Sequence, residues 1–124
     1  MKLTVGRTIA ASARSGWDIL VDLDAWPRWG PTVPRAELDH PSALALGSTG
    51  RVWTPIGIAL PFVITEFNEG RSWAWAVAGV PATAHRVEPR GEGCRITFQA
   101  PLWAPGYLPV LAVALRRIDG LLRR

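Results

Sequence analysis

The run from Trp103 to Leu122 constrains the fold of this chain more than any other stretch. Six apolar residues recur in it at steps of three and four, which places them on one face of an α-helix: Leu108, Leu111, Ala112, Leu115, Ile118 and Leu122. Pro109 fits a first turn, where its missing N–H needs no intrahelical partner, so we expect the helix to begin near Gly106. Because every residue from 108 to 115 is apolar, we expect the helix to be covered on several sides, by a curved sheet or by a partner.

The length and composition predict one folded domain spanning residues 1–124. Hydrophobic residues make up 48% of the chain and charged residues 19%, which argues against disorder. No apolar run approaches the roughly 20 residues that cross a bilayer, and the N-terminus lacks the apolar block of a signal peptide, so we expect a cytoplasmic protein. The lone Cys94 has no intrachain disulfide partner, and the sequence holds no Cys/His cluster. We therefore expect neither a metal nor a cofactor.

The charge pattern argues against nucleic-acid binding. The net charge of +4 comes from 14 basic and 10 acidic residues, and all but one of the basic residues are arginine. These arginines are scattered along the chain, whereas a nucleic-acid site needs a concentrated basic stripe. Such an arginine excess is typical of a GC-rich coding bias.

Apolar and polar residues alternate before the C-terminal run as they do in β-strands. Residues 3–10 alternate as a half-buried strand, Ser12 can cap a helix over 13–20, and a short turn follows at Trp26-Pro27-Arg28-Trp29. Six further strand-like runs, joined mostly by Gly or Pro, lie at 33–39, 48–55, 58–67, 71–78, 82–89 and 93–100. Short connections of this kind predict an antiparallel meander. The chain should therefore be an α+β domain.

Four segments carry a resemblance to a known family. Residues 18–29, with Trp26-Pro27 and Trp29 after an acidic helix end, resemble the helix pair of the polyketide cyclase/dehydrase-like branch of the START (Bet v 1-like, SRPBCC) superfamily. Residues 47–52, 64–75 and 85–97 resemble its following strands, in the same order. The resemblance covers nearly the whole chain, and its motifs indicate the fold far more specifically than a reaction.

The resemblance implies a helix-grip fold in a bacterial protein. In that fold a curved seven-stranded antiparallel sheet wraps around a long C-terminal helix, two short helices follow the first strand, and a deep apolar cavity lies between them. Family members include aromatase/cyclases and lipid and hormone carriers, so the fold alone does not identify the function. One departure is the run 55–62, whose two prolines predict an edge strand or a broken strand.

Strand alternation predicts which side chains face that cavity. It turns Trp73 and Trp75 inward on one strand and His85 on the next, and we favour Trp53 over Val52 as the inward residue of 48–55. Trp26 and Trp29 would sit at the mouth, and three leucines of the long helix would close the cavity. The predicted ligand-binding residues are Trp26, Trp29, Arg51, Trp53, Trp73, Trp75, His85, Phe98, Leu108, Leu111 and Leu115. The alternative is that these side chains are ordinary core, although seven tryptophans favour a cavity.

Few groups in this pattern could perform chemistry. His85 is the one inward titratable side chain and a candidate general acid or base, or else a neutral hydrogen-bonded histidine. Cys94 could approach it from a neighbouring strand, but cysteine is more often a small buried hydrophobe. Arg51 could hold a ligand carboxylate or phenolate, or lie exposed.

Three functions remain open at this point. The first is binding of a small hydrophobic ligand, aromatic or polyketide-like, in the internal cavity. The second is a polyketide cyclase or dehydratase in which His85 or Arg51 moves or stabilises charge. The third is a structural or regulatory module that docks a partner, including a second copy, through its C-terminal helix. The scarcity of inward polar groups favours binding over catalysis.

Overall fold

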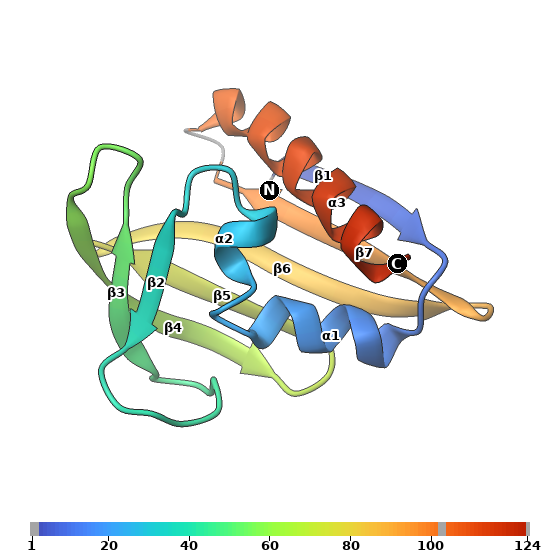
Figure 1. Cartoon of the computed structure of the whole chain (residues 1–124), viewed down its shortest axis with the longest axis horizontal. Helices are drawn as coiled ribbons and strands as arrows, with labels where there is room; N and C mark the ends of the chain where they lie inside the picture. The colour runs from blue at the N-terminus through green and yellow to red at the C-terminus, as the bar shows by residue number, and fades with distance from the viewer. Residues whose placement is uncertain (1–2, 102–103, 124) are drawn as a thin grey trace.

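The computed structural model describes residues 3–101 and 104–123 and confirms the predicted order of elements (Figure 1). The elements are β1 (Leu3–Ile9), α1 (Ala13–Val21), α2 (Trp26–Trp29), β2 (Arg35–Leu38), β3 (Thr49–Trp53), β4 (Ala59–Asn68), β5 (Ser72–Val77), β6 (Val80–Arg90), β7 (Gly93–Ala100), the 3₁₀ turn η1 (Pro105–Tyr107) and α3 (Leu108–Leu122). Ser12 caps α1 as predicted, because its side chain accepts a hydrogen bond from the Ser15 N–H. No helix in the described part of the chain is long and apolar enough to cross a membrane.

The seven strands form one antiparallel sheet in the order β1-β7-β6-β5-β4-β3-β2. From β2 to β7 each strand pairs with the next one in the chain, which is the predicted meander. β1 joins the far edge, with Leu3 opposite Ala100 and Ile9 opposite Cys94. All three helices lie on one face of the curved sheet (Figure 1), so the structure is the predicted helix-grip α+β fold.

α3 is covered on several sides, as its apolar sequence predicts. It packs on β1 and β7 and touches α1 and α2. Pro109 lies in its first turn, as predicted, whereas Trp103 lies outside the described residues. Its buried apolar residues are Leu111, Ala114, Leu115 and Ile118. Each buried leucine or isoleucine contributes roughly 2 kcal/mol of hydrophobic free energy, so this face anchors the helix to the sheet edge.

The prediction of an edge or broken strand at 55–62 is wrong. β4 is a ten-residue strand between β3 and β5, and Pro61 lies within it. The Pro61 carbonyl accepts a hydrogen bond from the Ala78 N–H at 2.8 Å, just beyond the first β4–β5 pair, Phe62 and Val77. Since the nitrogen and the carbonyl of one residue point to the same side of a strand, the missing N–H of Pro61 also faces the end of that ladder. The proline therefore lowers the stability of the sheet only slightly.

A buried carboxylate joins the end of α3 to β1, and the sequence pattern had not marked it. Asp119 is 5% exposed, and its Oδ2 accepts a hydrogen bond from Arg7 Nε at 2.6 Å. Its Oδ1 lies 2.7 Å from Arg123 Nε without an aligned hydrogen bond. A carboxylate can remain buried when cations compensate its charge, so this cluster holds the helix in register on the sheet edge.

We expect Asp119→Ala to lower the free energy of unfolding by about 2 kcal/mol, because it removes a charged hydrogen bond from a buried site. Urea denaturation measures the change. Asp18→Ala is the matched control, since the Asp18 ion pair with Arg14 on α1 is largely exposed and should be worth less than about 1 kcal/mol. Equal losses in the two variants would show that Asp119 does not anchor the helix.

Candidate functional site

Strand alternation places most of the β5, β6 and β7 side chains correctly. Thr83 and His85 on β6 are 8% and 3% exposed, and Phe98 on β7 is fully buried opposite His85. On β5, Trp73 is 1% exposed and Trp75 is half-buried. The two indoles are two residues apart on β5, so alternation places both on the inner side of the sheet, and the register shifts next to β5 add their extra residues to β4 and β6.

The inward tryptophans pack against one another rather than around an open space. Trp26 stacks on Trp73 with ring centroids 5.1 Å apart, and Trp75 meets Trp26 edge-on at 5.4 Å. Trp26 Nε1 and Trp73 Nε1 both donate to the Leu20 carbonyl, at 2.9 and 3.2 Å. The two indoles are thus held in place by stacking and by hydrogen bonds.

The predicted position of Trp26 and Trp29 at the cavity mouth is wrong. These side chains are 2% and 6% exposed, because α2 lies over the sheet and points both indoles down onto it. Trp29 packs on Phe98 at 5.6 Å and on His85 at 6.2 Å, and its Nε1 donates to the Ile19 carbonyl. Both tryptophans therefore belong to the buried core, and they line the cavity from within rather than at its mouth.

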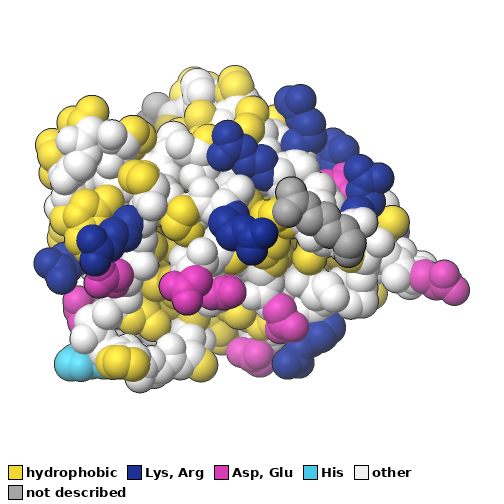
Figure 2. Space-filling view, in the orientation of Figure 1, with side chains coloured by type: hydrophobic (Ala, Val, Ile, Leu, Met, Phe, Trp, Pro, Cys, Tyr) yellow, Lys and Arg dark blue, Asp and Glu magenta, His cyan; other side chains and the backbone are white. Residues whose placement is uncertain are grey.

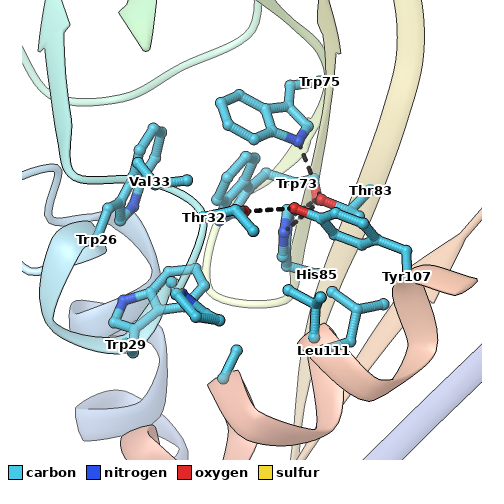
Figure 3. Close-up of a pocket in the computed structure, with 14 residues that line it drawn as sticks. Trp26, Trp29, Thr32, Val33, Trp73, Trp75, Thr83, His85, Tyr107 and Leu111 are labelled. Carbon is cyan, nitrogen blue, oxygen red and sulfur yellow. Dashed lines mark hydrogen bonds between the residues drawn. The ribbon is translucent and has the colours of Figure 1, made fainter. Parts of the chain in front are cut away.

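A small cavity, here called the inner cavity, remains between this core and α3 (Figure 3). Its volume is about 40 Å³. It is lined by Trp26, Trp29, Gly30, Pro31, Thr32, Val33, Trp73, Trp75, Thr83, His85, Tyr107, Val110, Leu111 and Ala114. A space of this size holds a water molecule, whereas a single benzene ring occupies a cavity of about 150 Å³. The inner cavity alone is thus too small for the expected aromatic ligand.

His85 is part of a linear series of hydrogen bonds beside this cavity (Figure 3). Trp75 Nε1 donates to Thr83 Oγ1 at 3.0 Å, and Thr83 Oγ1 lies 3.0 Å from His85 Nε2. His85 Nδ1 lies 3.3 Å from the Trp73 carbonyl, which can only accept. The proton is therefore assigned to Nδ1, and Nε2 accepts from the Thr83 hydroxyl.

This environment keeps the imidazole uncharged. Burial lowers the pKa of His85 from 6.5 to about 3, against a smaller opposing effect of the hydrogen bond to the Trp73 backbone. The side chain is neutral at physiological pH, with both ring nitrogens engaged. His85 therefore shapes the cavity wall, and its pKa is poorly matched to general acid or base catalysis near neutrality.

A larger apolar hollow, here called the outer groove, adjoins the inner cavity. Its volume is about 360 Å³, and it is lined by Thr32, Val33, Val52, Trp53, Thr54, Pro55, Leu60, Trp75, Val77, Ala82, Thr83, Pro101, Ala104 and Tyr107. Thr32, Val33, Trp75, Thr83 and Tyr107 line both spaces. At this boundary the Thr32 and Tyr107 hydroxyls are hydrogen-bonded at 2.7 Å (Figure 3), linking the α2–β2 loop to the start of α3.

The expected inward orientation of Trp53 is wrong, and of the two alternatives left open for Arg51 the structure shows the exposed one. On β3 the buried positions are Gly50 and Val52, and the side chain of Arg51 is exposed. A side chain at position 50 would collide with the Phe62 ring, which occupies the inner side of the sheet there. Trp53 is half-buried, and its ring is flanked by guanidinium carbons of Arg35 at 4.5 Å and Arg51 at 5.5 Å. Trp53 still borders the outer groove, whereas Arg51 borders neither space.

The leucines of α3 divide between site and core. Leu111 lines the inner cavity, whereas Leu115 is 1% exposed and Leu108 half-buried against the core, and neither lines either space. The sequence pattern had not selected Tyr107 or Thr83. The signals available were that Tyr107 is the only tyrosine of the chain and that Thr83 shares the inward face of His85.

Cys94 does not meet His85. It lies opposite Pro89, whereas His85 lies opposite Phe98, so four residues, or about 13 Å, separate the two along the strands. Burial raises the pKa of the Cys94 thiol, which lowers its nucleophilicity at neutral pH. Within the described residues, no group of three His, Cys, Asp or Glu side chains is placed to bind a metal ion.

Comparison with known proteins identifies relatives of this fold. Residues 1–123 match the family described as polyketide cyclase / dehydrase and lipid transport. An uncharacterized protein of Mycobacterium tuberculosis, Rv2574, is 28% identical over 132 residues, covering 94% of this chain and 78% of that protein. Protein MLL2253 from Mesorhizobium loti superposes with a TM-score of 0.80 at 12% identity, covering 100% of this chain and 98% of that one. The Aha1 dimer from Colwellia psychrerythraea superposes with a TM-score of 0.73 at 15% identity, covering 98% and 96%. At these identities, the two structures show a shared fold alone.

Proposed function

Because the chain belongs to the polyketide cyclase / dehydrase and lipid transport family, we propose that it binds a small hydrophobic ligand, aromatic or polyketide-like, in the outer groove. The observation that carries this proposal is an apolar groove of about 360 Å³ that shares five lining residues with a cavity deeper in the protein. Ligand sites typically have volumes of about 300–1,000 Å³ and few polar groups, and the outer groove fits both descriptions.

The groove offers a flat ligand two kinds of contact. Leu60, Trp75 and Val77 provide apolar walls from neighbouring strands of the sheet. The hydroxyls of Thr32 and Tyr107 are the polar groups near the inner end, where they could exchange their mutual hydrogen bond for bonds to ligand oxygens. Parting of these two hydroxyls would connect the groove with the inner cavity beside His85 and Leu111.

The other two candidate functions have less support. A cyclase or dehydratase would use His85 or Arg51, but His85 is neutral and fully hydrogen-bonded, and Arg51 points away from both spaces. A module docking through α3 would need an exposed apolar helix face, but Leu111, Leu115 and other apolar residues of that face are buried against the sheet and the short helices. Binding without catalysis therefore accounts best for the site.

We expect Val77→Trp to abolish ligand binding, because the larger side chain would fill the groove where Val77 now lines it. Tryptophan fluorescence quenching by a planar probe such as naphthalene measures the affinity, and at least a tenfold loss is expected when the binding volume is occupied. Native mass spectrometry of the purified protein would identify a co-purified ligand. Quenching of the unchanged protein should be saturable.

Val63→Trp is the matched control, since Val63 lies on β4 between the inward residues Phe62 and Ile64 and thus points to the other side of the sheet. It adds the same indole while leaving the groove open. If both variants bind the probe like the unchanged protein, or if the unchanged protein shows no saturable quenching, the groove is not the binding site.

A further inference from the structure

Exposed apolar side chains gather at the end of the molecule where the outer groove lies. Among the residues that the structure describes, the exposed large hydrophobic ones are Leu46, Ile56, Ile58 and Val80, at 67%, 79%, 52% and 47%. Ile56 and Ile58 form the turn between β3 and β4, and Val80 begins β6 just after the turn from β5. Because the strands alternate in direction, these two turns lie at the same end of the sheet. Leu46 lies at the opposite end, in the β2–β3 loop.

Four stretches of the sequence that reach this end contain no charged side chain. The stretches 29–34, 52–65, 72–84 and 96–115 contain no Asp, Glu, Lys or Arg, and each includes a loop at this end. The charges nearest to the β3–β4 turn along β2 and β3 are Arg35, Glu37 and Arg51, of which Arg35 and Glu37 form an ion pair. Figure 2 shows apolar side chains over this hairpin, with basic and then acidic side chains beside them.

Charges of both signs lie towards the other end. Asp22, Asp24 and Glu69 line a hollow beside α1, and Arg71 and Arg90 lie at the β4–β5 and β6–β7 turns there. The net charge of +4 attracts the whole molecule to an anionic surface. Because Ile56, Ile58 and Val80 lie at one end, these apolar side chains rather than the charges would set the orientation of the molecule on such a surface.

We propose that the apolar end docks on an anionic lipid surface. Ile56 and Ile58 would enter the boundary between headgroups and acyl chains, Trp53 would lie at the headgroup level, and Arg51 would meet lipid phosphates. Two separate projecting turns suit a soft surface better than a rigid protein, because a specific protein interface needs a complementary patch of about 800 Å² on each side. The apolar turns and the net positive charge of the protein together favour an anionic lipid surface.

Docking in this orientation would also bring the outer groove close to the lipid. Thr54 and Pro55 of the β3–β4 turn and Ala82 of β6 line the outer groove, so its opening would face the lipid. A hydrophobic ligand could then pass between the bilayer and the groove without crossing water. This last step rests on the proposed function, whereas docking itself does not.

Vesicle co-sedimentation tests the proposal, using phosphatidylcholine vesicles with and without phosphatidylglycerol. The unchanged protein should bind the anionic vesicles, and its partition coefficient should fall at high salt. Ile56→Glu combined with Ile58→Glu should lower the partition coefficient more than about tenfold, because two apolar anchors become charged. Arg51→Gln should lower it by roughly fivefold, on anionic vesicles alone.

Two controls match these variants. Leu46→Glu places the same charge at an exposed leucine of the opposite end, and Arg71→Gln removes an exposed arginine from the β4–β5 turn there. Both should bind vesicles like the unchanged protein. Thermal unfolding, followed by circular dichroism, should show that all variants fold, since the five substituted residues are exposed.

Three results would overturn the proposal. One is the absence of vesicle binding by the unchanged protein, and another is equal loss in the variants and their controls. The third is a dimer, seen by light scattering, that the Ile56/Ile58 double variant converts to monomers, because a second copy would then occupy this end. Probe quenching separates the two proposals. The Ile56/Ile58 double variant should still show saturable quenching by the probe. If the unchanged protein binds vesicles but shows no saturable quenching, only the proposed ligand binding in the outer groove is contradicted.

Discussion

Trp26→Ala should lower the free energy of unfolding by about 3–5 kcal/mol. Trp26 is 2% exposed, stacks on Trp73 and touches the rings of Phe62 and Trp75, so the substitution removes an indole from the centre of the core. It also removes the hydrogen bond to the Leu20 carbonyl. Since domains of this size are stable by only about 5–15 kcal/mol, the variant should unfold at much lower urea concentrations.

Trp53→Ala is the control with the same change in side chain. Trp53 is half-buried, and flanking guanidinium groups are its main partners on the outer side, so a loss of about 1–2 kcal/mol is expected. Added indole should raise the melting temperature of Trp26→Ala but not of Trp53→Ala, because the vacated space joins the inner cavity. Equal stabilities of the two variants would show that Trp26 is not a core residue.

The second large effect is a loss of stability in acid caused by His85. Its pKa is about 3 in the folded protein and 6.5 when unfolded, so the unfolded chain binds the proton first as the pH falls. The stabilisation from a neutral His85 is complete above pH 6.5 and declines by about 1.4 kcal/mol per pH unit down to about pH 3. Between pH 7.5 and 4.5 this amounts to roughly 3 kcal/mol.

His85→Gln separates this effect from carboxylate titration. Glutamine retains hydrogen-bonding capacity beside Thr83 and Trp73 but cannot bind a proton in this range. The variant should be less stable at pH 7.5, yet lose roughly 3 kcal/mol less than the unchanged protein by pH 4.5, as measured by urea denaturation. Two results would contradict the assignment: parallel pH profiles of stability for the variant and the unchanged protein, or an imidazole NMR signal of His85 that titrates near 6.5.

Periodicity alone predicted the elements and much of the inner face. The three- and four-residue spacing of leucines identified α3, and strict alternation placed His85 and Phe98 inward. These predictions succeeded because one face of each element is buried, so a shift by one residue would expose the whole apolar set. The resemblance to a family then supplied the arrangement of the sheet around the helix.

The failed predictions concern features that depend on distant residues. On β3 the pattern is ambiguous, because Trp53 and Val52 are both apolar, and the Phe62 ring on the neighbouring strand decides the face. Asp119 looked like one more polar residue until folding brought Arg7 to it across 112 positions. A cytoplasmic location, a bacterial source and the absence of nucleic-acid binding stay predictions from the sequence.

The position of β1 imposes an order on assembly. Its sheet neighbour is β7, whose last residue is Ala100, whereas each later strand pairs with a strand adjacent in the chain. On the ribosome, β1 is made before the other six strands but cannot pair with β7 until residues 93–100 have been synthesised. Closing so long a loop carries a large entropic cost and slows folding. We therefore expect β1 and α3, which pack on each other, to join the sheet late in folding, and the Tyr107 side of the groove to form with them.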